Sequence, residues 1–555
     1  MERERSVWRR GAVALVLVAF AALGAISSIV VPPFETPDEI WHYAFIQQVA
    51  SGGGLPLSEP ATRALWRQQG AQAPGYYLAA AALTAWIDQS DFPDIYERAN
   101  PHAAIGVPYA QRSINYLLHY RNEGWPWRGS ILALHVARFF SVALGVATLW
   151  ASYRLLRLLV GEEVALLSVA LFAFIPQFVF ISGATSNDNA INALAALLLW
   201  RLVVLLKEAP PRSGAPDPAG LATPWRSPRS YLLIGLLLGL ALLAKISGLW
   251  LLPLTFFALG IVAYRLRSWR TFGESALLVG GLALLLAGWW YWRNWRLYGD
   301  WLATNIWLSN ILLRLEPAGW RVIAGELESL HHSFWGLFGW FNVAYPAWLY
   351  RAFQAVEFLV ASGLLLTAVR TKERGVPAAG PRGARSGPDD RTHTLHWRRA
   401  GLALLFLWLI AITISWLGFM RIAAAAQGRY FHPAAPAIAM LMAVGLRAWR
   451  IPGTRFPVLA WGVVAGLFLV SAATSWWILR PVYTPSAAVA ATEPVTIFEG
   501  DEGAFGLQAA EIRTKATTPG SVVEMELVWQ IVEPPARDWS LFVHLVRPDG
   551  VIVAQ

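Results

Sequence analysis

Residues 32–42 read Pro32-Pro33-Phe34-Glu35-Thr36-Pro37-Asp38-Glu39-Ile40-Trp41-His42 and directly follow an apolar run, residues 11–31. The run is long enough to cross a bilayer as one helix, which takes about 20 apolar residues. Two adjacent carboxylates, Asp38 and Glu39, and the imidazole of His42 therefore lie where a first membrane span would emerge. This placement predicts acid–base chemistry at one face of a membrane.

Apolar segments dominate the rest of the chain. Of its 555 residues, 56% are hydrophobic and 14% are charged, whereas soluble domains are roughly 25% charged. The apolar segments are continuous rather than alternating, which is typical of membrane helices and excludes a membrane β-barrel. We therefore expect an all-α polytopic membrane protein, because lipid admits only helices or closed barrels as spanning structures.

The membrane spans are expected to number about eleven. After the first run they lie at about 130–150, 163–182, 188–206, 230–246, 248–265, 273–292, 353–370, 400–419, 431–448 and 457–478. The basic N-terminus and the length of the first run favour a retained anchor over a signal peptide, with the N-terminus in the cytoplasm. Lys and Arg then fall in every second loop, which indicates a multi-pass protein of the plasma (inner) membrane with an extracytoplasmic C-terminus.

The chain divides into a membrane domain, residues 1–480, and a tail, residues 481–555. Two long segments of the membrane domain, 32–129 and 293–352, are expected outside. The segment 371–397 is rich in Gly, Pro, Arg and Ala and is expected to form a disordered cytoplasmic loop. Alternating apolar residues predict a small β-sandwich-like tail, which could be a truncated domain.

Charge and cysteine content exclude several function classes. The net charge is +10, but Lys and Arg sit in short loops between spans, so the sequence predicts no nucleic-acid partner. The chain has no Cys, which rules out disulfides, thiolate chemistry and Cys-ligated metals. It also contains no P-loop, dinucleotide-binding fingerprint, Ser-nucleophile elbow or HExxH motif.

The Thr36-Pro37-Asp38-Glu39 segment has a purely structural interpretation beside the catalytic one. Thr at the N-cap, Pro at N1 and Glu at N3 form a capping box, which predicts a helix from Asp38 to about residue 50. The two interpretations are compatible, since a capped helix is a rigid mount for a catalytic carboxylate. Asp38 and His42 share a helix face and could also hold a divalent cation, but no third ligand is evident.

Other polar side chains are expected at the same outer face. Asp188, in Ser186-Asn187-Asp188-Asn189, lies at an outer turn, where its segment could simply cap a helix. Lys245 lies near the outer end of its span and needs an anionic partner unless it snorkels to the interface. Arg293 and Arg429 also fall at outer span ends. Several cations facing carboxylates suit a phosphate at headgroup depth, although interfacial anchoring explains any one of them equally well.

Two further features remain open. Arg138 lies within the second span and needs a partner there. Trp335, Trp340 and Trp348 lie in the outer segment 293–352, where they could stack on sugar rings, but packing in a membrane belt or core is the favoured interpretation.

A first span followed by a Pro-rich loop with Pro-Asp-Glu and a nearby His resembles the multi-spanning GT-C glycosyltransferases, above all the protein O-mannosyltransferase and aminoarabinose-transferase clan (glycosyltransferase family 39 type). The resemblance covers about residues 8–480. The other matching motifs are Gln72-Ala73-Pro74-Gly75-Tyr76-Tyr77, Ser186-Asn187-Asp188, Ala244-Lys245, Arg293-Asn294 with Tyr298-Gly299-Asp300, and Gln427-Gly428-Arg429-Tyr430.

The resemblance implies transfer of a sugar from a polyprenyl-phosphate donor to a lipid, glycan or protein acceptor on the extracytoplasmic face. The catalytic base of such families matches Asp38, with Glu39 as an orienting group or alternative base. Lys245 and Arg429 would bind the phosphate, and the remaining substrate-binding candidates are His42, Asp188, Arg293 and Tyr430. No cofactor is required, although a divalent cation could take part.

The chemistry of these residue types agrees with a transferase, because a carboxylate can take the acceptor proton and cations can stabilise the leaving phosphate. One displacement would invert the anomeric centre. A transporter or flippase of lipid-linked sugars is the alternative. Another is a passive envelope anchor whose outer β module binds carbohydrate. The absence of an internal repeat and the one-sided placement of polar residues favour the transferase.

Overall fold

The computed structural model describes residues 2–61, 64–110, 114–119, 123–209, 228–373, 388–450, 457–484, 495–500, 503–512, 525–533, 545–546 and 552–554. The chain forms two compact units, Met1–Tyr483 and Thr484–Gln555. The first unit carries every charged residue singled out in the sequence.

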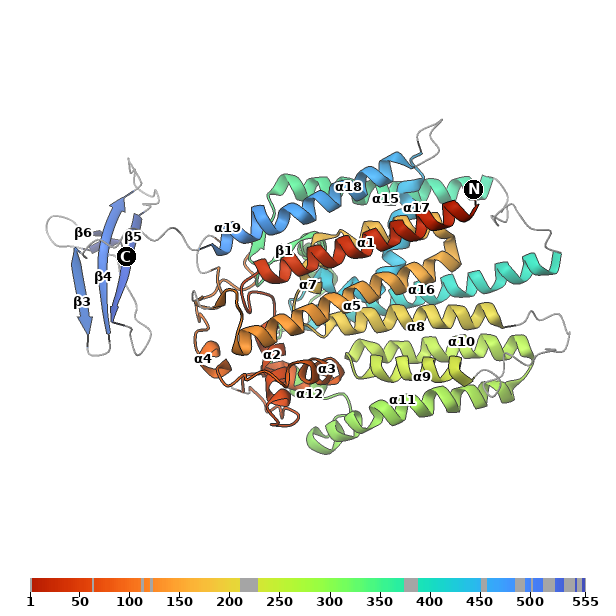
Figure 1. Cartoon of the computed structure of the whole chain (residues 1–555), viewed down its shortest axis with the longest axis horizontal. Helices are drawn as coiled ribbons and strands as arrows, with labels where there is room; N and C mark the ends of the chain where they lie inside the picture. Colours follow the sequence, from red (N-terminus) through yellow and green to blue (C-terminus); the bar gives the residue numbers. More distant parts are fainter. Residues whose placement is uncertain are drawn as a thin grey trace. The chain divides into compact units, whose positions relative to one another are not determined.

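Long apolar helices build the first unit and run side by side along the horizontal of Figure 1. Close helix pairs form where glycines remove side-chain bulk: Gly235 and Gly239 of α9 lie directly against α11. The elements are α1 Glu2–Val30, α5 Gly129–Val160, α6 Glu162–Ala173, α7 Pro176–Ser182, α8 Asp188–Glu208, α9 Pro228–Leu242, η3 Ile246–Trp250, α10 Leu251–Leu266, α11 Trp269–Tyr298, α15 Ala347–Glu373, α16 Pro388–Ile422, η4 Gly428–Ala434, α17 Ala435–Arg447, α18 Val458–Ala473, η5 Thr474–Leu479 and α19 Arg480–Tyr483.

The predicted multi-pass helical membrane fold is confirmed, but the count of eleven spans is not. Eight helices within the described residues are long and apolar enough to cross a membrane, or nine if α6 and α7 form one bent span. The bend of 71° falls just before Pro176, whose missing N–H interrupts the helix. All eleven predicted segments are helical, yet α9 has 15 residues and α17 has 13, and both are shorter than a full span.

Short elements gather at one end of the bundle, the left-hand end in Figure 1 for α2, α3, α4 and α12. They come from the two long segments predicted to lie outside. Their bounds are α2 Glu39–Ala50, η1 Arg67–Ala71, α3 Gly75–Thr84, α4 Phe92–Tyr96, α12 Thr304–Leu308, α13 Trp320–Gly325, α14 Leu327–Trp335, β1 Leu337–Phe338 and β2 Val343–Ala344.

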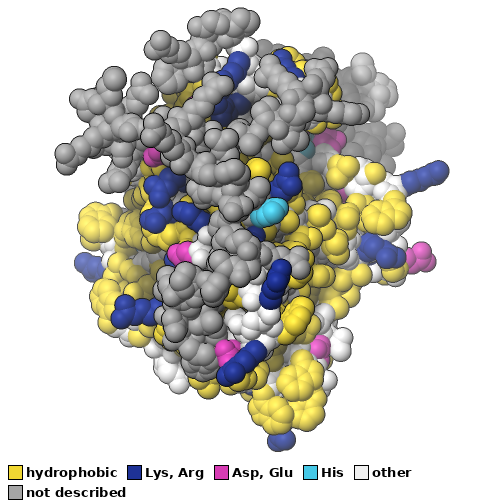
Figure 2. All heavy atoms as spheres, turned by 90° about the vertical axis from the view of Figure 1, so that its right-hand side faces the viewer, with side chains coloured by type: hydrophobic (Ala, Val, Ile, Leu, Met, Phe, Trp, Pro, Cys, Tyr) yellow, Lys and Arg dark blue, Asp and Glu magenta, His cyan; other side chains and the backbone are white. Residues whose placement is uncertain are grey.

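The opposite end of the bundle is rich in basic side chains. Helices α5, α8, α10 and α17 each carry one in their last turn, namely Arg157, Lys207, Arg265 and Arg447. Figure 2 looks onto this end, where Lys and Arg are more frequent than Asp and Glu among the coloured side chains. These four helix ends flank loops predicted to be cytoplasmic and lie away from the short elements.

The predicted capping box is wrong. Helix α2 begins at Glu39, and its N-cap residue is Asp38, which has a left-handed φ of 64° and makes no side-chain capping hydrogen bond. The hydroxyl of Thr36 is buried and bonds to none of the residues that the structure describes. The carboxylate of Glu39 does not fold back onto the N-cap, because a buried arginine binds it instead.

The predicted loop 371–397 is helical at both ends. Helix α15 continues to Glu373 and α16 begins at Pro388, and residues 374–387 lie outside the described part of the chain.

The second unit is β-rich, as the sequence predicts. Strands β3 Thr496–Gly500, β4 Gly503–Ile512 and β5 Met525–Glu533 form an antiparallel sheet in the order β3-β4-β5. Strands β6 Leu545–Val546 and β7 Ile552–Ala554 pair separately.

Candidate functional site

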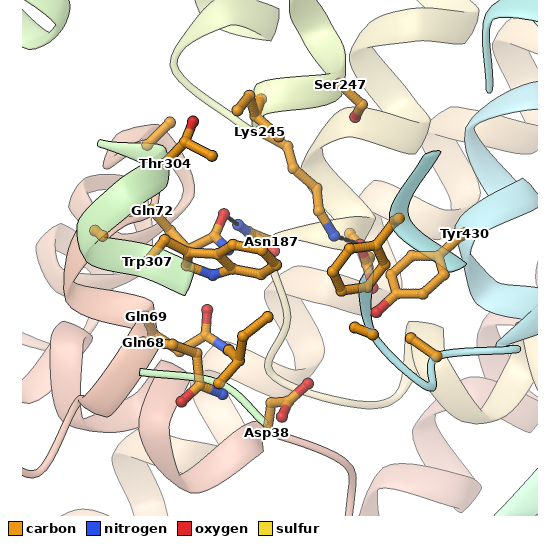
Figure 3. Close-up of a pocket in the computed structure, with 18 of the residues that line it drawn as sticks. Asp38, Gln68, Gln69, Gln72, Asn187, Lys245, Ser247, Thr304, Trp307 and Tyr430 are labelled. Atoms are coloured by element: carbon orange, nitrogen blue, oxygen red, sulfur yellow. Dashed lines mark hydrogen bonds and ion pairs between the residues drawn. The ribbon is translucent and has the colours of Figure 1, made fainter. Parts of the chain in front are cut away.

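A cavity of about 620 Å³ is lined in part by residues of the short elements α2, η1 and α12. Figure 3 shows that its labelled side chains come from separate parts of the chain. They include Asp38 before α2, Gln68 and Gln69 on η1, Asn187 before α8, Lys245 between α9 and η3, and Tyr430 on η4. The cavity therefore gathers polar residues that lie far apart in the sequence.

Four charged side chains of alternating sign line one side of the cavity. Arg429 Nη2 lies 2.7 Å from Asp38 Oδ2, and Arg429 Nε lies 3.8 Å from Asp188 Oδ2. The other carboxylate oxygen of Asp188 pairs with Lys245 Nζ. We call the series Asp38, Arg429, Asp188 and Lys245 the charge chain. The anionic partner that Lys245 was expected to need is Asp188.

Asp38 occupies a special backbone position. Its left-handed φ of 64° is strained for a non-glycine residue, while its carbonyl accepts the backbone N–H groups of Trp41 and His42. Its side chain is 23% exposed, and only Oδ2 accepts a hydrogen bond from the described residues. The chain turn thus directs a carboxylate with one open oxygen into the cavity.

Glu39 points the other way and does not line the cavity. Its carboxylate and the guanidinium of Arg138 are both fully buried and form a bidentate pair at 2.9 and 2.6 Å. The backbone N–H of Thr185 donates to Glu39 at 2.8 Å. Arg138 also donates to the carbonyls of Ser28, Val31 and Pro32. The partner expected for Arg138 is therefore Glu39, whose carboxylate is part of a structural clamp.

His42 and Tyr430 line the cavity, but Arg293 does not. His42 Nδ1 lies 2.7 Å from the hydroxyl of Tyr77, and burial lowers the pKa of His42 to about 4, so the imidazole is neutral at pH 7. The Tyr430 ring has Lys245 Nζ at 5.5 Å and the Arg429 guanidinium at 5.6 Å from its centre. Arg293 donates to the carbonyl of Pro56 at 2.8 Å.

Asn187 and Lys245 mark two interruptions in the helices around the cavity. Asn187 is the N-cap residue of α8 by position but makes no capping hydrogen bond. Its Nδ2 instead donates to Gln72 Oε1 at 3.3 Å and to the Ala244 carbonyl at 3.4 Å. Lys245 is extended and separates α9 from η3. Asn187 thus links the start of α8 to the end of η1 and to the segment between α9 and η3.

Metal ligands do not converge on Asp38 and His42. Among the described residues, no group of three or more His, Asp or Glu side chains is placed to hold a metal ion.

Gln68, Gln69 and Trp307 line the cavity although no sequence motif points to them. The tryptophans considered for sugar stacking lie elsewhere: Trp335 and Trp340 are buried in the core, and Trp348 is exposed outside the cavity. One feature of the sequence could have drawn attention to Gln68 and Gln69: they come just before Gln72, the first residue of a motif that carries the family resemblance.

Comparison with known proteins gives one family match. Residues 133–214, from α5 through the end of α8, match the model of the dolichyl-phosphate-mannose-protein mannosyltransferase family. This match confirms the resemblance to protein O-mannosyltransferases over that segment. A search of curated proteins finds no match.

Several solved membrane transferases are similar to this chain at low identity. The oligosaccharyltransferase of Archaeoglobus fulgidus is 14% identical with a TM-score of 0.44, covering 84% of this chain and 56% of its own. ArnT from Cupriavidus metallidurans bound to undecaprenyl phosphate is 15% identical with a TM-score of 0.41, covering 84% of this chain and 64% of its own. The Pmt1–Pmt2 protein O-mannosyltransferase complex of S. cerevisiae is 16% identical with a TM-score of 0.32, covering 51% and 34%. The chain thus spans little more than half the length of the first structure.

Proposed function

We propose that the protein is a membrane glycosyltransferase that moves a sugar from a polyprenyl-phosphate donor to an acceptor hydroxyl. The observation that carries the proposal is the charge chain, which places an open carboxylate oxygen and two cations on one cavity wall. The match of α5 to α8 with a family named for a lipid-phosphate sugar donor supports the same donor class.

The proposed reaction is a single displacement at the anomeric carbon. Asp38 Oδ1 takes the proton of the acceptor hydroxyl. At the same time the oxygen of that hydroxyl attacks the anomeric carbon and forms the new glycosidic bond. The bond from the anomeric carbon to the phosphate oxygen breaks at the same time, and its electron pair leaves with the lipid phosphate. The configuration at the anomeric carbon inverts. The step as written uses no cofactor.

Lys245 and Arg429 would stabilise the charge that develops on the leaving phosphate. Arg429 donates from Nε to Gln427 and from Nη2 to Asp38. Asp188 lies between the two cations and faces one with each carboxylate oxygen. Its proposed role is to hold the cations at a fixed spacing, with His42 and Tyr430 as the neighbouring walls.

We place the cavity on the extracytoplasmic face of the plasma (inner) membrane, with the N-terminus in the cytoplasm. The basic helix ends opposite the cavity support this orientation. The acceptor would be a lipid, glycan or protein that approaches from outside.

The test is sugar transfer in proteoliposomes from a panel of polyprenyl-phosphate sugars, with wild type, Asp38→Asn and a matched control, Asp88→Asn. Asn keeps the size of Asp and tolerates a left-handed φ, but it cannot act as a base. Asp88 lies on an exposed turn outside the cavity. We expect Asp38→Asn to lose about 10²–10⁴-fold in kcat and Asp88→Asn to match wild type. Equal turnover in all three proteins would refute Asp38 as the base, and net sugar-lipid transport without transfer would refute the transferase.

A further inference from the structure

Beside the charge chain, the cavity is lined by amides and an aromatic ring. Gln68, Gln69 and Gln72, with Asn187 beside Gln72, present carboxamide groups to the cavity, and Trp307 lies among them. Figure 3 shows this group on the left, with the Lys245 ammonium and Tyr430 on the right and Asp38 below. We call Gln68, Gln69, Gln72 and Asn187 the amide wall.

We propose that the amide wall and Trp307 bind the sugar of the donor, and that this sugar is an uncharged, hydroxyl-rich ring. The proposal rests on the proposed transferase function and adds to it the substrate class and the residues that select it.

The amides of η1 have hydrogen-bonding capacity that the protein does not use. Gln68 is 8% exposed and Gln69 is 4% exposed, and neither carboxamide bonds to another described residue. Gln69 Oε1 is buried and has no partner among the described residues. An unpaired buried polar group is costly, so such groups in a native protein call for a ligand or water. A carboxamide offers two donors and an acceptor, which matches sugar hydroxyls that both donate and accept.

The backbone of η1 holds these amides in place. The N–H of Gln69 donates to the Trp66 carbonyl at 2.9 Å, and the N–H of Gln72 donates to the Gln69 carbonyl at 2.9 Å. A side chain at Gly70 would collide with Trp66 and Ser58, so the turn packs closely there. The wall is therefore formed before a ligand arrives, which reduces the entropy cost of binding.

Trp307 supplies an aromatic face beside the amides. It belongs to α12, which packs against η1, and its ring lies 5.5 Å from the ring of Phe419. Its indole N–H is buried without a partner among the described residues. The apolar C–H face of a sugar ring packs well on such a surface while its hydroxyls point to the amides.

The amide wall itself carries no charged side chain, so it offers no ion-pair partner to a charged sugar. The carboxylates that line the cavity are Asp38 and Asp188, and both already face cations of the charge chain. An ammonium on the sugar would thus lack an anion at the amide wall. Arg67 also lines the cavity, but it is an exposed residue whose guanidinium covers the ring of Trp41 at 4.9 Å. The wall itself therefore suits neutral hydroxyls.

The test measures binding to the full-length protein in detergent or nanodiscs, apart from turnover. The ligands are bare polyprenyl phosphate and polyprenyl phosphates that carry a neutral hexose, an amino sugar or a uronic acid. The proteins are wild type, Gln68→Leu, Gln69→Leu, Gln69→Glu and a matched control, Gln47→Leu, which lies half-buried on α2 outside the cavity.

In wild type we expect the neutral-sugar lipid to bind more tightly than bare polyprenyl phosphate and more tightly than either charged-sugar lipid. Gln68→Leu and Gln69→Leu should each reduce that advantage about tenfold, the equivalent of one hydrogen bond, without changing the Kd of bare polyprenyl phosphate. Gln69→Glu should shift preference toward the amino sugar, and Gln47→Leu should behave as wild type.

Tighter binding of a charged-sugar lipid by wild type would overturn the proposal, as would an unchanged preference in all three wall variants. Its failure can be told apart from failure of the proposed function. Preferential binding of the neutral sugar without transfer to any acceptor would refute the transferase and leave the sugar site standing. Transfer without preference for neutral sugars would refute the sugar site and leave the transferase standing.

Discussion

Asp38 and Glu39 are adjacent in the chain, yet their carboxylates have opposite surroundings. One faces the cavity with an open oxygen, and the other is sealed in the core with Arg138. Burying a charged pair is tolerated only while both partners are present, because the remaining ion would be left without compensation. The two residues should therefore fail in different ways when each is neutralised.

We expect Glu39→Gln to destabilise the protein by about 3–5 kcal/mol, since it leaves the Arg138 guanidinium buried without its counter-ion. Thermal unfolding in detergent, followed by tryptophan fluorescence, measures the loss. Transfer activity per folded molecule should stay within a few fold of wild type, because Glu39 does not touch the cavity. A stable Glu39→Gln protein without activity would contradict this assignment and make Glu39 the base.

Of the two cations in the charge chain, Lys245 pairs with one carboxylate and Arg429 lies beside two. Loss of one charge-assisted contact to phosphate is worth about 10–100-fold in affinity, so Lys245→Gln should weaken binding of bare polyprenyl phosphate by that factor. The matched control is Lys207→Gln, which removes an exposed lysine in the last turn of α8, at the opposite end of the bundle. Equal affinities for the two variants would remove Lys245 from the phosphate site.

At the scale of elements, a cluster of ionisable groups ties the turn before Asp38 to described residues between α4 and α5. Glu35 is fully buried and accepts the N–H groups of Tyr116 and Leu117 at 3.0 and 2.9 Å. His119 bridges two carboxylates, with Nε2 at 3.0 Å from Glu35 and Nδ1 at 2.8 Å from Glu123. The turn that carries Asp38 is thus held by a group that can lose its proton.

This cluster predicts a loss of stability at alkaline pH. Burial lowers the pKa of His119, but the hydrogen bonds and charges of Glu123 and Glu35 outweigh burial and raise it to about 9. A histidine whose pKa is raised in the folded state stabilises that state fully at pH values below its unfolded pKa of about 6.5. This stabilisation is lost as the pH rises through the folded pKa of about 9. Unfolding scans from pH 6 to 10 should show a loss approaching about 3 kcal/mol.

The pH dependence should shrink in His119→Gln and persist in a control, His102→Gln, which changes an exposed histidine of the same segment. If both variants retain the full dependence on pH, another group is responsible.

The pattern of apolar residues predicted the long helices but did not predict the short ones. Continuous apolar runs identify membrane helices because lipid demands them, so all eleven predicted segments are helical. The count was less secure, because helix length and the break at Pro176 decide what crosses a membrane. The capping box failed because the long-range pair of Glu39 with Arg138 replaces a local hydrogen bond, and local patterns do not report contacts 99 residues apart.

The sequence predicted the charged residues of the candidate site, because charge is rare near membrane depth. It missed the uncharged polar residues, because such residues are common in loops. Asp38, Asp188, Lys245 and Arg429 stand out because charged groups near membrane depth need partners, and the structure brings all four together. Arg293 was predicted on the same grounds, but its guanidinium donates to the carbonyl of Pro56 instead. Gln68 and Gln69 were missed, since glutamines in an irregular loop are normally solvated and only the tertiary fold buries them.

For the whole molecule, cavity and basic helix ends lie at opposite ends of one bundle, so orientation decides which compartment supplies the acceptor. The absence of Cys permits a direct test with single cysteines. Ser90→Cys marks an exposed position in the first outer segment, and Arg270→Cys marks the other end, where the native side chain is 88% exposed. In intact cells, a membrane-impermeant maleimide should label Ser90→Cys and leave Arg270→Cys unlabelled until the membrane is opened. The reverse pattern would place the charge chain in the cytoplasm, where an extracytoplasmic acceptor could not reach Asp38.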